Sequence, residues 1–125
     1  MRWWRGRTKS LAQRGEDLAA AFLRRSGFKI LGRNVELGRY ELDIIARESD
    51  TIAFVEVKTR RDDGLATPED NVTPRKRLHI RRAAHRFIDE QDDPNMYYRF
   101  DIIAIVWPDE GEPSITHYRD AFPDE

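Results

Sequence analysis

The apolar residues of this chain follow two periods, and the change between them predicts the secondary structure. A helical period over residues 10–26 predicts a first helix, with Gly27 in the left-handed conformation at its end. A second helix is predicted over residues 73–89. It begins at Thr73-Pro74, an N-cap followed by a proline at the first helical position. Each helix carries one apolar stripe, so each is expected to pack against a sheet.

Runs of β-branched and apolar residues predict five strands, over residues 28–37, 40–46, 51–60, 97–107 and 114–118. The second and third runs are joined by the short polar link 47–50, which predicts a hairpin with a few-residue loop. A polar loop with helix and strand breakers is predicted at 62–70. The order α-β-β-β-α-β-β predicts an α/β fold, with a mixed β-sheet flanked by helices.

The length of 125 residues predicts one domain over residues 10–125, preceded by a basic, flexible tail over residues 1–9. Charged residues make up 36% of the chain, and the 39% of hydrophobic residues is enough for one sheet-centred core. The absence of cysteine excludes disulfide bonds and zinc–thiolate sites. No apolar run reaches the length of a membrane span or a signal core, so we expect a cytoplasmic protein without a membrane partner.

The net charge is only -1, but the charges are unevenly distributed along the chain. Residues 1–14 and 75–88 contain arginines and lysines without any acidic residue, whereas acidic residues gather at 62–70, 89–93 and 109–112. Clustering of one sign matters more than the sum of charges for binding a polyanion. The distribution therefore favours nucleic acid as a partner.

The second predicted helix has a positive stripe formed by Arg75, His79, Arg82 and Arg86. A charged stripe is usually a solvated face, but this one lacks the acidic residues that normally alternate with basic ones. Basic residues at a helix start also oppose the macrodipole, which prefers anions there. Phosphate binding explains the cluster at residues 75–77 better than helix stability does.

The predicted hairpin carries charged residues where a purely structural strand would be apolar: Asp43 in its first strand, and Glu56 and Lys58 in its second. Glu56 and Lys58 share a face about 6.6 Å apart, because side chains alternate along a strand. If Asp43 lies on that face, two carboxylates about 4 Å apart repel by roughly 4 kcal/mol at an effective dielectric near 20. One lysine cannot balance both, which leaves room for a hard divalent cation held by oxygen ligands.

The spacing of Asp43, Glu56 and Lys58 also resembles the D…(D/E)xK motif of the restriction-endonuclease-like (PD-(D/E)xK) nuclease fold. Several further segments resemble the uncharacterised YraN-like family of bacterial proteins: residues 15–19, 40–46, 54–60, 72–77, 99–104 and 120–122. That family is similar in motif layout to archaeal Holliday-junction resolvases. The resemblance implies a nuclease-like fold and nucleic-acid binding. This chain departs from the family at Tyr40, where glycine is usual, and the larger side chain is expected to crowd the approach to the site.

These observations favour a nucleic-acid-binding protein that is a metal-dependent endonuclease and hydrolyses phosphodiesters, with DNA favoured over RNA as the expected substrate. Asp43, Glu56 and the Val57 backbone carbonyl would hold Mg²⁺ or Mn²⁺. Lys58 would orient the attacking water or stabilise charge on the phosphorane, and Glu16 from the first helix would assist a second metal or the water. Glu41 is a weaker candidate. The residues expected to contact phosphates are Arg60, Arg75, Lys76, Arg82 and Arg86.

Two other functions stay open at this stage. A non-catalytic nucleic-acid-binding module would keep the nuclease fold, and a protein-interaction domain would give Asp43, Glu56 and Lys58 no special arrangement. The form of the nucleic acid is also open, although a branched substrate would favour a two-fold homodimer. We expect Arg99 and Asp101 to form a structural pair, and the three histidines show no metal-ligand spacing.

Overall fold

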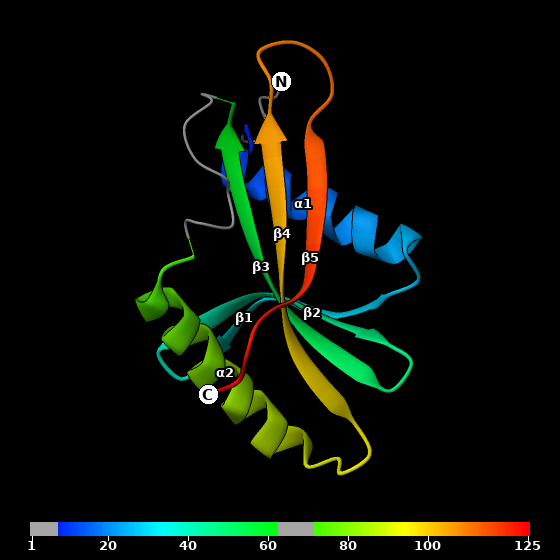
Figure 1. Cartoon of the computed structure of the whole chain (residues 1–125), viewed down its shortest axis with the longest axis vertical. Coiled ribbons are helices and arrows are strands. Elements are labelled where there is room, and N and C mark those ends of the chain that lie inside the picture. Colours follow the sequence, from blue (N-terminus) through cyan, green and yellow to red (C-terminus); the bar gives the residue numbers. More distant parts are fainter. Residues whose placement is uncertain (1–7, 63–71) are drawn as a thin grey trace, which may run out of the picture.

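The computed structural model describes residues 8–62 and 72–125, and within them the chain forms one sheet with a helix on each face (Figure 1). Along the chain the elements are α1 (Leu11–Arg25), β1 (Lys29–Leu37), β2 (Tyr40–Glu48), β3 (Thr51–Arg61), α2 (Pro74–Gln91), β4 (Tyr97–Trp107) and β5 (Ser114–Phe122). This order is the one predicted. Most of the predicted basic tail and of the loop at 62–70 lies outside the described residues.

The five strands lie in the order β1-β2-β3-β4-β5. Three of the four pairings are antiparallel, and the β3–β4 pairing is parallel because the chain crosses over through α2 between these strands. The predicted mixed sheet is therefore confirmed. The β2–β3 hairpin closes over Ser49 and Asp50, with Ser49 in a left-handed conformation (φ 54°).

Two apolar clusters fill the space between the sheet and its helices. The side that α2 covers contains Ile45, Phe54, Ile80, Phe100 and Ile102 among others. The side that α1 covers contains Ala19, Leu23, Val55, Val57 and Ile103 among others. Alternation along β3 thus directs its even-numbered side chains toward α2 and its odd-numbered ones toward α1. Glu56 and Lys58 belong by this alternation to the α2 side.

The helix ends follow the local signals in the sequence. Ser10 is the N-cap of α1 and forms a capping box with Gln13, and Gly27 follows the helix with φ 98°. Thr73 is the N-cap of α2, and its side chain accepts a hydrogen bond from the Lys76 N–H at 3.2 Å. No helix in the described part of the chain is long and apolar enough to span a membrane.

Strand β5 is longer than predicted and reaches Phe122 instead of ending at Tyr118. The register shifts between Phe100 and Ile102, and the buried Asp101 at the shift accepts a hydrogen bond from the Asp120 N–H at 2.9 Å. This bond lets the strand continue past the irregularity. Phe122 then stacks on Phe100 with ring centroids 5.0 Å apart. The continuation depends on a side chain from another strand, which a local pattern does not contain.

Candidate functional site

Asp43 and Glu56 lie opposite each other at the point where the β2–β3 ladder ends. The last paired residues are Ile44 and Val55, so Asp43 and Glu56 would form the next pair in the same register. There the Asp43 side chain replaces the backbone as the pairing group of β2, because its Oδ2 accepts a hydrogen bond from the Val57 N–H at 2.9 Å. Residues opposite each other in an antiparallel pair share a face of the sheet. The structure therefore brings the two acidic residues together, as predicted.

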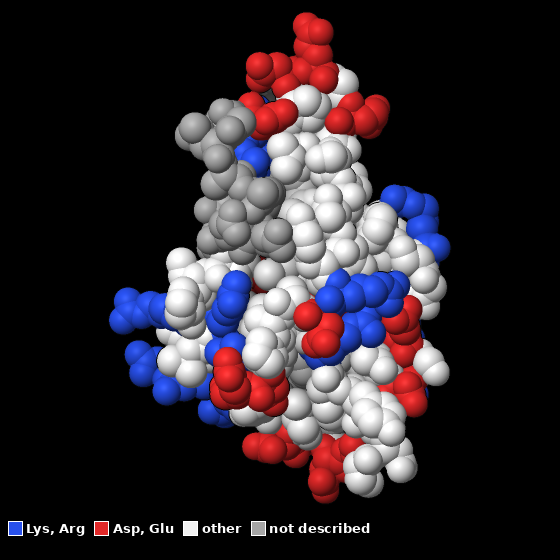
Figure 2. Space-filling view, viewed as in Figure 1, with Lys and Arg blue, Asp and Glu red and all other residues white. Residues whose placement is uncertain are grey.

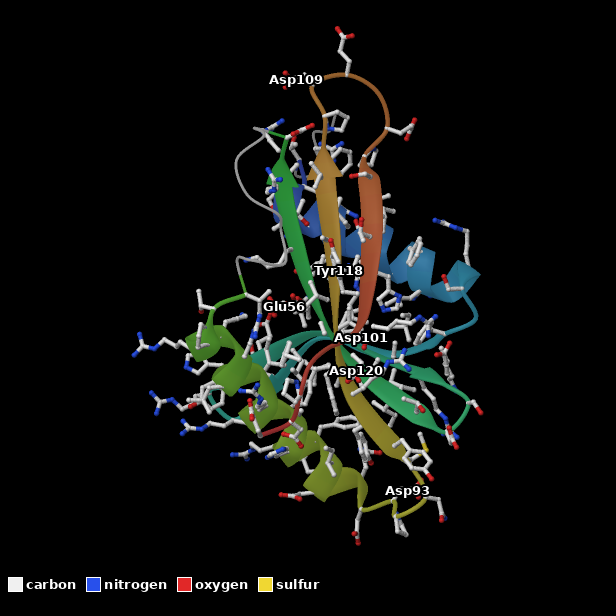
Figure 3. The ribbon with its side chains drawn as sticks, viewed as in Figure 1. Glu56, Asp93, Asp101, Asp109, Tyr118 and Asp120 are labelled. Atoms are coloured by element: carbon white, nitrogen blue, oxygen red, sulfur yellow. The ribbon has the colours of Figure 1, made fainter. Side chains whose placement is uncertain are left out.

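The Glu56 side chain is buried, with a residue exposure of 6% (Figure 3). Burial, followed by the negative charge of Asp43, raises the pKa of Glu56 to about 8. A hydrogen bond between the two carboxyl groups raises the pKa further, while the positive charges of Lys76 and Lys58 lower it. Without a bound cation, Glu56 with its pKa of about 8 thus keeps its proton at neutral pH, in hydrogen-bond contact with Asp43.

Lysines from two different elements face Glu56. Lys58 follows it on β3 and was expected beside it. Lys76 comes from the first turn of α2, and its Nζ lies 3.7 Å from Glu56 Oε1. The charge of Lys76 acts on the pKa of Glu56 more strongly than that of Lys58. The sequence had indicated Lys76 only as a phosphate contact, because its basic neighbours gave no sign that this one residue faces the sheet.

Glu16 reaches the same region from α1, on the other side of Asp43. It is half-buried, and burial and then the charge of Asp43 raise the pKa of its carboxyl, against a hydrogen bond with Asn34 and the charge of Arg33. Glu41 also acts to raise this pKa. Glu16 lines a cavity of about 190 Å³ together with Lys9, Gln13, Asp17, Arg33 and Asn34. It therefore lies at the rim of the site.

Within residues 8–62 and 72–125, no three Asp, Glu or His side chains lie close enough to hold a metal ion together. Glu16 therefore does not complete a three-carboxylate cluster with Asp43 and Glu56. At the centre the structure brings together the carboxyl groups of Asp43 and Glu56, and the backbone carbonyl of Val57 stays the third ligand predicted from the sequence.

A close approach of α1 to the sheet sets the position of Glu16. A Cβ atom on Gly15 would collide with the Thr59 side chain on β3, so only glycine allows the helix this near. Because Glu16 is the next residue, the contact between Gly15 and Thr59 also determines how far Glu16 extends toward Asp43.

The basic face of α2 lies over the tip of the β1–β2 hairpin. Arg82 donates a hydrogen bond from Nη1 to the Tyr40 hydroxyl at 3.1 Å, and the Tyr40 ring lies 4.8 Å from the His79 ring. The Arg86 guanidinium packs against Gly38, where a Cβ would lie 2.9 Å from Nη1. Arg75 is exposed. Figure 2 shows basic side chains gathered along this edge of the molecule.

Other cations of α2 and β3 have different surroundings. Arg77 and Arg81 both lie 5.3 Å from the Phe122 ring, and Arg81 donates to the Pro123 carbonyl at 2.9 Å, so these two hold the end of β5. Arg60 continues the face of Glu56 along β3 and donates to the Arg61 carbonyl at 3.2 Å. The positive surface next to Glu56 is thus the part of α2 that faces the hairpin.

A second charged cluster is buried on the opposite, α1 side of the sheet. Asp101 has no exposed surface and accepts hydrogen bonds from Arg99 Nε at 2.9 Å and from the Asp120 N–H, and His117 Nε2 lies 2.8 Å away. Burial acts to raise the pKa of Asp101, but these partners outweigh it and lower the pKa. The predicted pairing of Arg99 with Asp101 is confirmed. The contact of His117 with Asp101 was not predicted. His117 comes from another strand, β5, and no residue next to it in the sequence marks it as a partner of Asp101.

Comparison with known proteins places the chain in a family. It is 44% identical over 117 residues to a UPF0102 protein from Nocardia farcinica, covering 94% of this chain and 92% of that one. Identity is 42% over 114 residues to a UPF0102 protein from Geotalea daltonii, covering 91% and 90%. A UPF0102 protein from Chlorobaculum parvum is 43% identical over 109 residues, covering 87% and 84%. The model of the uncharacterised protein family UPF0102 matches residues 15–105, and the chain belongs to this family, the YraN-like one that its motifs resemble.

Proposed function

We propose that this chain is a metal-dependent nuclease of the restriction-endonuclease-like class that hydrolyses phosphodiesters, with DNA as the expected substrate. The observation that carries the proposal is the contact between the carboxyl groups of Asp43 and Glu56 beside a basic helix. Two carboxyl groups in hydrogen-bond contact must share a proton or bind a cation, because two adjacent negative charges repel each other. Burial of Glu56 adds a desolvation cost to its charged form. A structural Glu–Lys pair would not require a second acid.

The donors at this point fit a hard divalent cation such as Mg²⁺ or Mn²⁺, which prefers oxygen ligands. Asp43, Glu56 and the Val57 carbonyl would hold it. The hydrogen bond from the Val57 N–H orients Asp43, and the remaining carboxylate lone pairs can serve as ligands. When bound, such an ion polarises a phosphoryl oxygen and lowers the pKa of a coordinated water.

The other groups of the site would act on the substrate and on water. Lys58 shares the face of Glu56 and can orient an attacking water or stabilise negative charge on the phosphorane. Glu16 lies at the rim beside Asp43, and its pKa is raised. It is therefore better suited to exchange a proton with water than to bind a metal together with Glu56. Glu41 acts on the pKa of Glu16 and stays a weaker candidate for the same role.

The basic face of α2 would bind the phosphate backbone. Its cations flank the carboxylates on the side of the hairpin, so a strand bound there passes close to Glu56. Contacts to phosphate set affinity and position without reading the bases. The residues proposed for this contact are Arg75, Lys76, Arg82 and Arg86 on α2, together with Arg60 on the neighbouring β3.

The proposal is tested by incubating the purified protein with branched, duplex and single-stranded DNA, in Mn²⁺ or in EDTA. We expect cleavage that requires Mn²⁺ and that is lost in Asp43→Asn and in Glu56→Gln. Cleavage that persists in EDTA, or equally in both variants, would refute the assignment of the site.

A non-catalytic nucleic-acid-binding module is the second candidate. It is favoured by the absence, in the described residues, of a third acidic or histidine side chain close enough to share a metal with Asp43 and Glu56. This alternative predicts that every DNA form binds in Mn²⁺ without cleavage. Binding without cleavage under all conditions would select it over the nuclease.

A further inference from the structure

The structure offers Glu56 a cation that the motif on β3 does not contain. Lys76 Nζ lies 3.7 Å from Glu56 Oε1, and the glutamate side chain is 7% exposed while the lysine side chain is 43% exposed. The amine of this partly exposed lysine thus lies beside a buried carboxyl group. It stands between the candidate metal ligands and the surface where nucleic acid would bind.

The side chain of Lys76 can change partner without moving the helix. The Lys76 N–H donates to the Thr73 side chain at 3.2 Å, and the Arg77 N–H donates to the Thr73 carbonyl at 2.9 Å, so the N-cap anchors the backbone. A lysine side chain carries a compact charged amine at the end of a flexible stem of four carbons. The amine can therefore turn from Glu56 toward solvent at little cost to the fold.

A divalent cation and a phosphate would each weaken the contact between Lys76 and Glu56. A divalent cation beside Asp43 and Glu56 would compensate the Glu56 charge and repel the lysine amine. A phosphate at the first turn of α2 would attract that amine, since the turn contains no acidic residue and the neighbouring Arg75 is exposed. Each ligand thus favours the same position of the lysine, away from Glu56.

We propose that Lys76 is a shared cation that pairs with Glu56 in the metal-free protein and passes to a phosphate of the nucleic acid when a divalent ion binds. This inference rests on the proposed function. Its consequence is thermodynamic coupling, in which metal binding strengthens nucleic-acid binding and nucleic acid strengthens metal binding by the same factor. In the metal-free protein the Lys76 amine stays beside Glu56, and the site is ready for catalysis only when both ligands are present.

The test uses Ca²⁺, as a divalent ion with the same preference for oxygen ligands, and a labelled DNA duplex. We would measure Ca²⁺ binding by calorimetry without DNA, and the Kd for DNA with Ca²⁺ and with EDTA at constant ionic strength. The variant Lys76→Met keeps an unbranched, flexible stem of nearly the same length and removes the charge. The variant Arg75→Met is the matched control, because it removes an exposed charge from the neighbouring position.

Lys76→Met should bind Ca²⁺ more tightly than the wild type without DNA, because a competing positive charge has gone. Its ratio of Kd for DNA in EDTA to Kd in Ca²⁺ should fall by about fivefold or more, a coupling of ordinary size. Arg75→Met should weaken DNA binding under both conditions and leave the ratio unchanged. Lys76→Arg keeps the charge and should keep most of the coupling, which guards against a folding defect in Lys76→Met.

An unchanged Ca²⁺ affinity and an unchanged ratio in Lys76→Met would overturn the inference while leaving the proposed function intact. Equal loss of coupling in Arg75→Met would overturn it as well, since the effect would then belong to the whole helix. A wild type that binds neither Ca²⁺ nor DNA would instead contradict the proposed function, and the role of Lys76 with it.

Discussion

Val57 donates its backbone N–H to Asp43 Oδ2 at 2.9 Å, and this bond holds the acid of one strand against the strand that carries Glu56. The bond occurs where backbone pairing between β2 and β3 stops. A side chain therefore continues the ladder at the point where the two carboxylates meet. The approach of the two acids depends on this contact.

Replacing Glu56 by glutamine tests the metal site. Glutamine keeps the size of the side chain but removes the charge that a hard cation needs. We expect Mn²⁺ to raise the melting temperature of the wild type and to leave that of Glu56→Gln unchanged, while DNA binding persists. A variant that is destabilised beside a wild type indifferent to Mn²⁺ would favour a structural Glu–Lys pair, since Lys76 would then have lost its main partner.

The pH dependence of stability follows from the raised pKa of Glu56. This pKa is about 8 in the folded protein, against an ordinary value of 4.5, so the folded state keeps a proton that the unfolded chain releases between these values. Stability without metal should therefore fall as the pH rises from about 4.5 to about 8. Urea unfolding of the wild type and Glu56→Gln across this range measures the contribution, which should appear as a shallower decline in the variant. Identical slopes would show that Glu56 ionises normally.

The basic face of α2 is tested by the triple variant Arg75→Ala, Lys76→Ala and Arg82→Ala. We expect DNA binding to weaken about equally for all sequences, with a salt dependence reduced by roughly one phosphate contact per residue. The measurement is Kd against salt concentration.

A matched control removes the same number of exposed charges elsewhere, by Arg24→Ala, Arg25→Ala and Lys29→Ala at the far end of α1 and the start of β1. This control should leave the salt slope nearly unchanged. Equal effects of the two triple variants would mean that only the net charge matters.

Gly15→Ala should destabilise the fold by about 1–3 kcal/mol, because the new methyl group collides with Thr59. Adding Thr59→Ala should recover part of the loss, since it removes the hydroxyl and the methyl group that Gly15 approaches. A double-mutant cycle by urea unfolding measures the recovery. Strictly additive effects would show that helix α1 can move away from β3 without cost.

Asp101→Asn separates the buried charged cluster from the site. Removing this charge deprives Arg99 and His117 of their shared anion, with only Arg99 keeping a second one in Glu48, and we expect a cost of about 3–5 kcal/mol in unfolding free energy. Ca²⁺ affinity of the folded variant should not change, because Asp101 lies on the opposite face of the sheet from Glu56. A folded variant with weakened Ca²⁺ binding would connect the cluster to the metal centre.

The sequence by itself determined the secondary-structure elements of this protein and the proximity of Asp43 and Glu56. Helix periods, the caps at Ser10 and Thr73, and the runs of β-branched residues are local signals, and they predicted the order of all described elements. The opposition of Asp43 and Glu56 is also nearly local, because a short hairpin sets the register and alternation then sets the face.

Only the tertiary structure decided which charges surround those acids. Lys76 faces Glu56, and Glu16 remains at the rim beside Asp43, because of how each helix packs on its side of the sheet. The length of β5 and the place of His117 likewise depend on Asp101, which lies on another strand. These contacts join residues far apart in the chain, and their geometry follows from packing of whole elements, which no local period of the sequence contains.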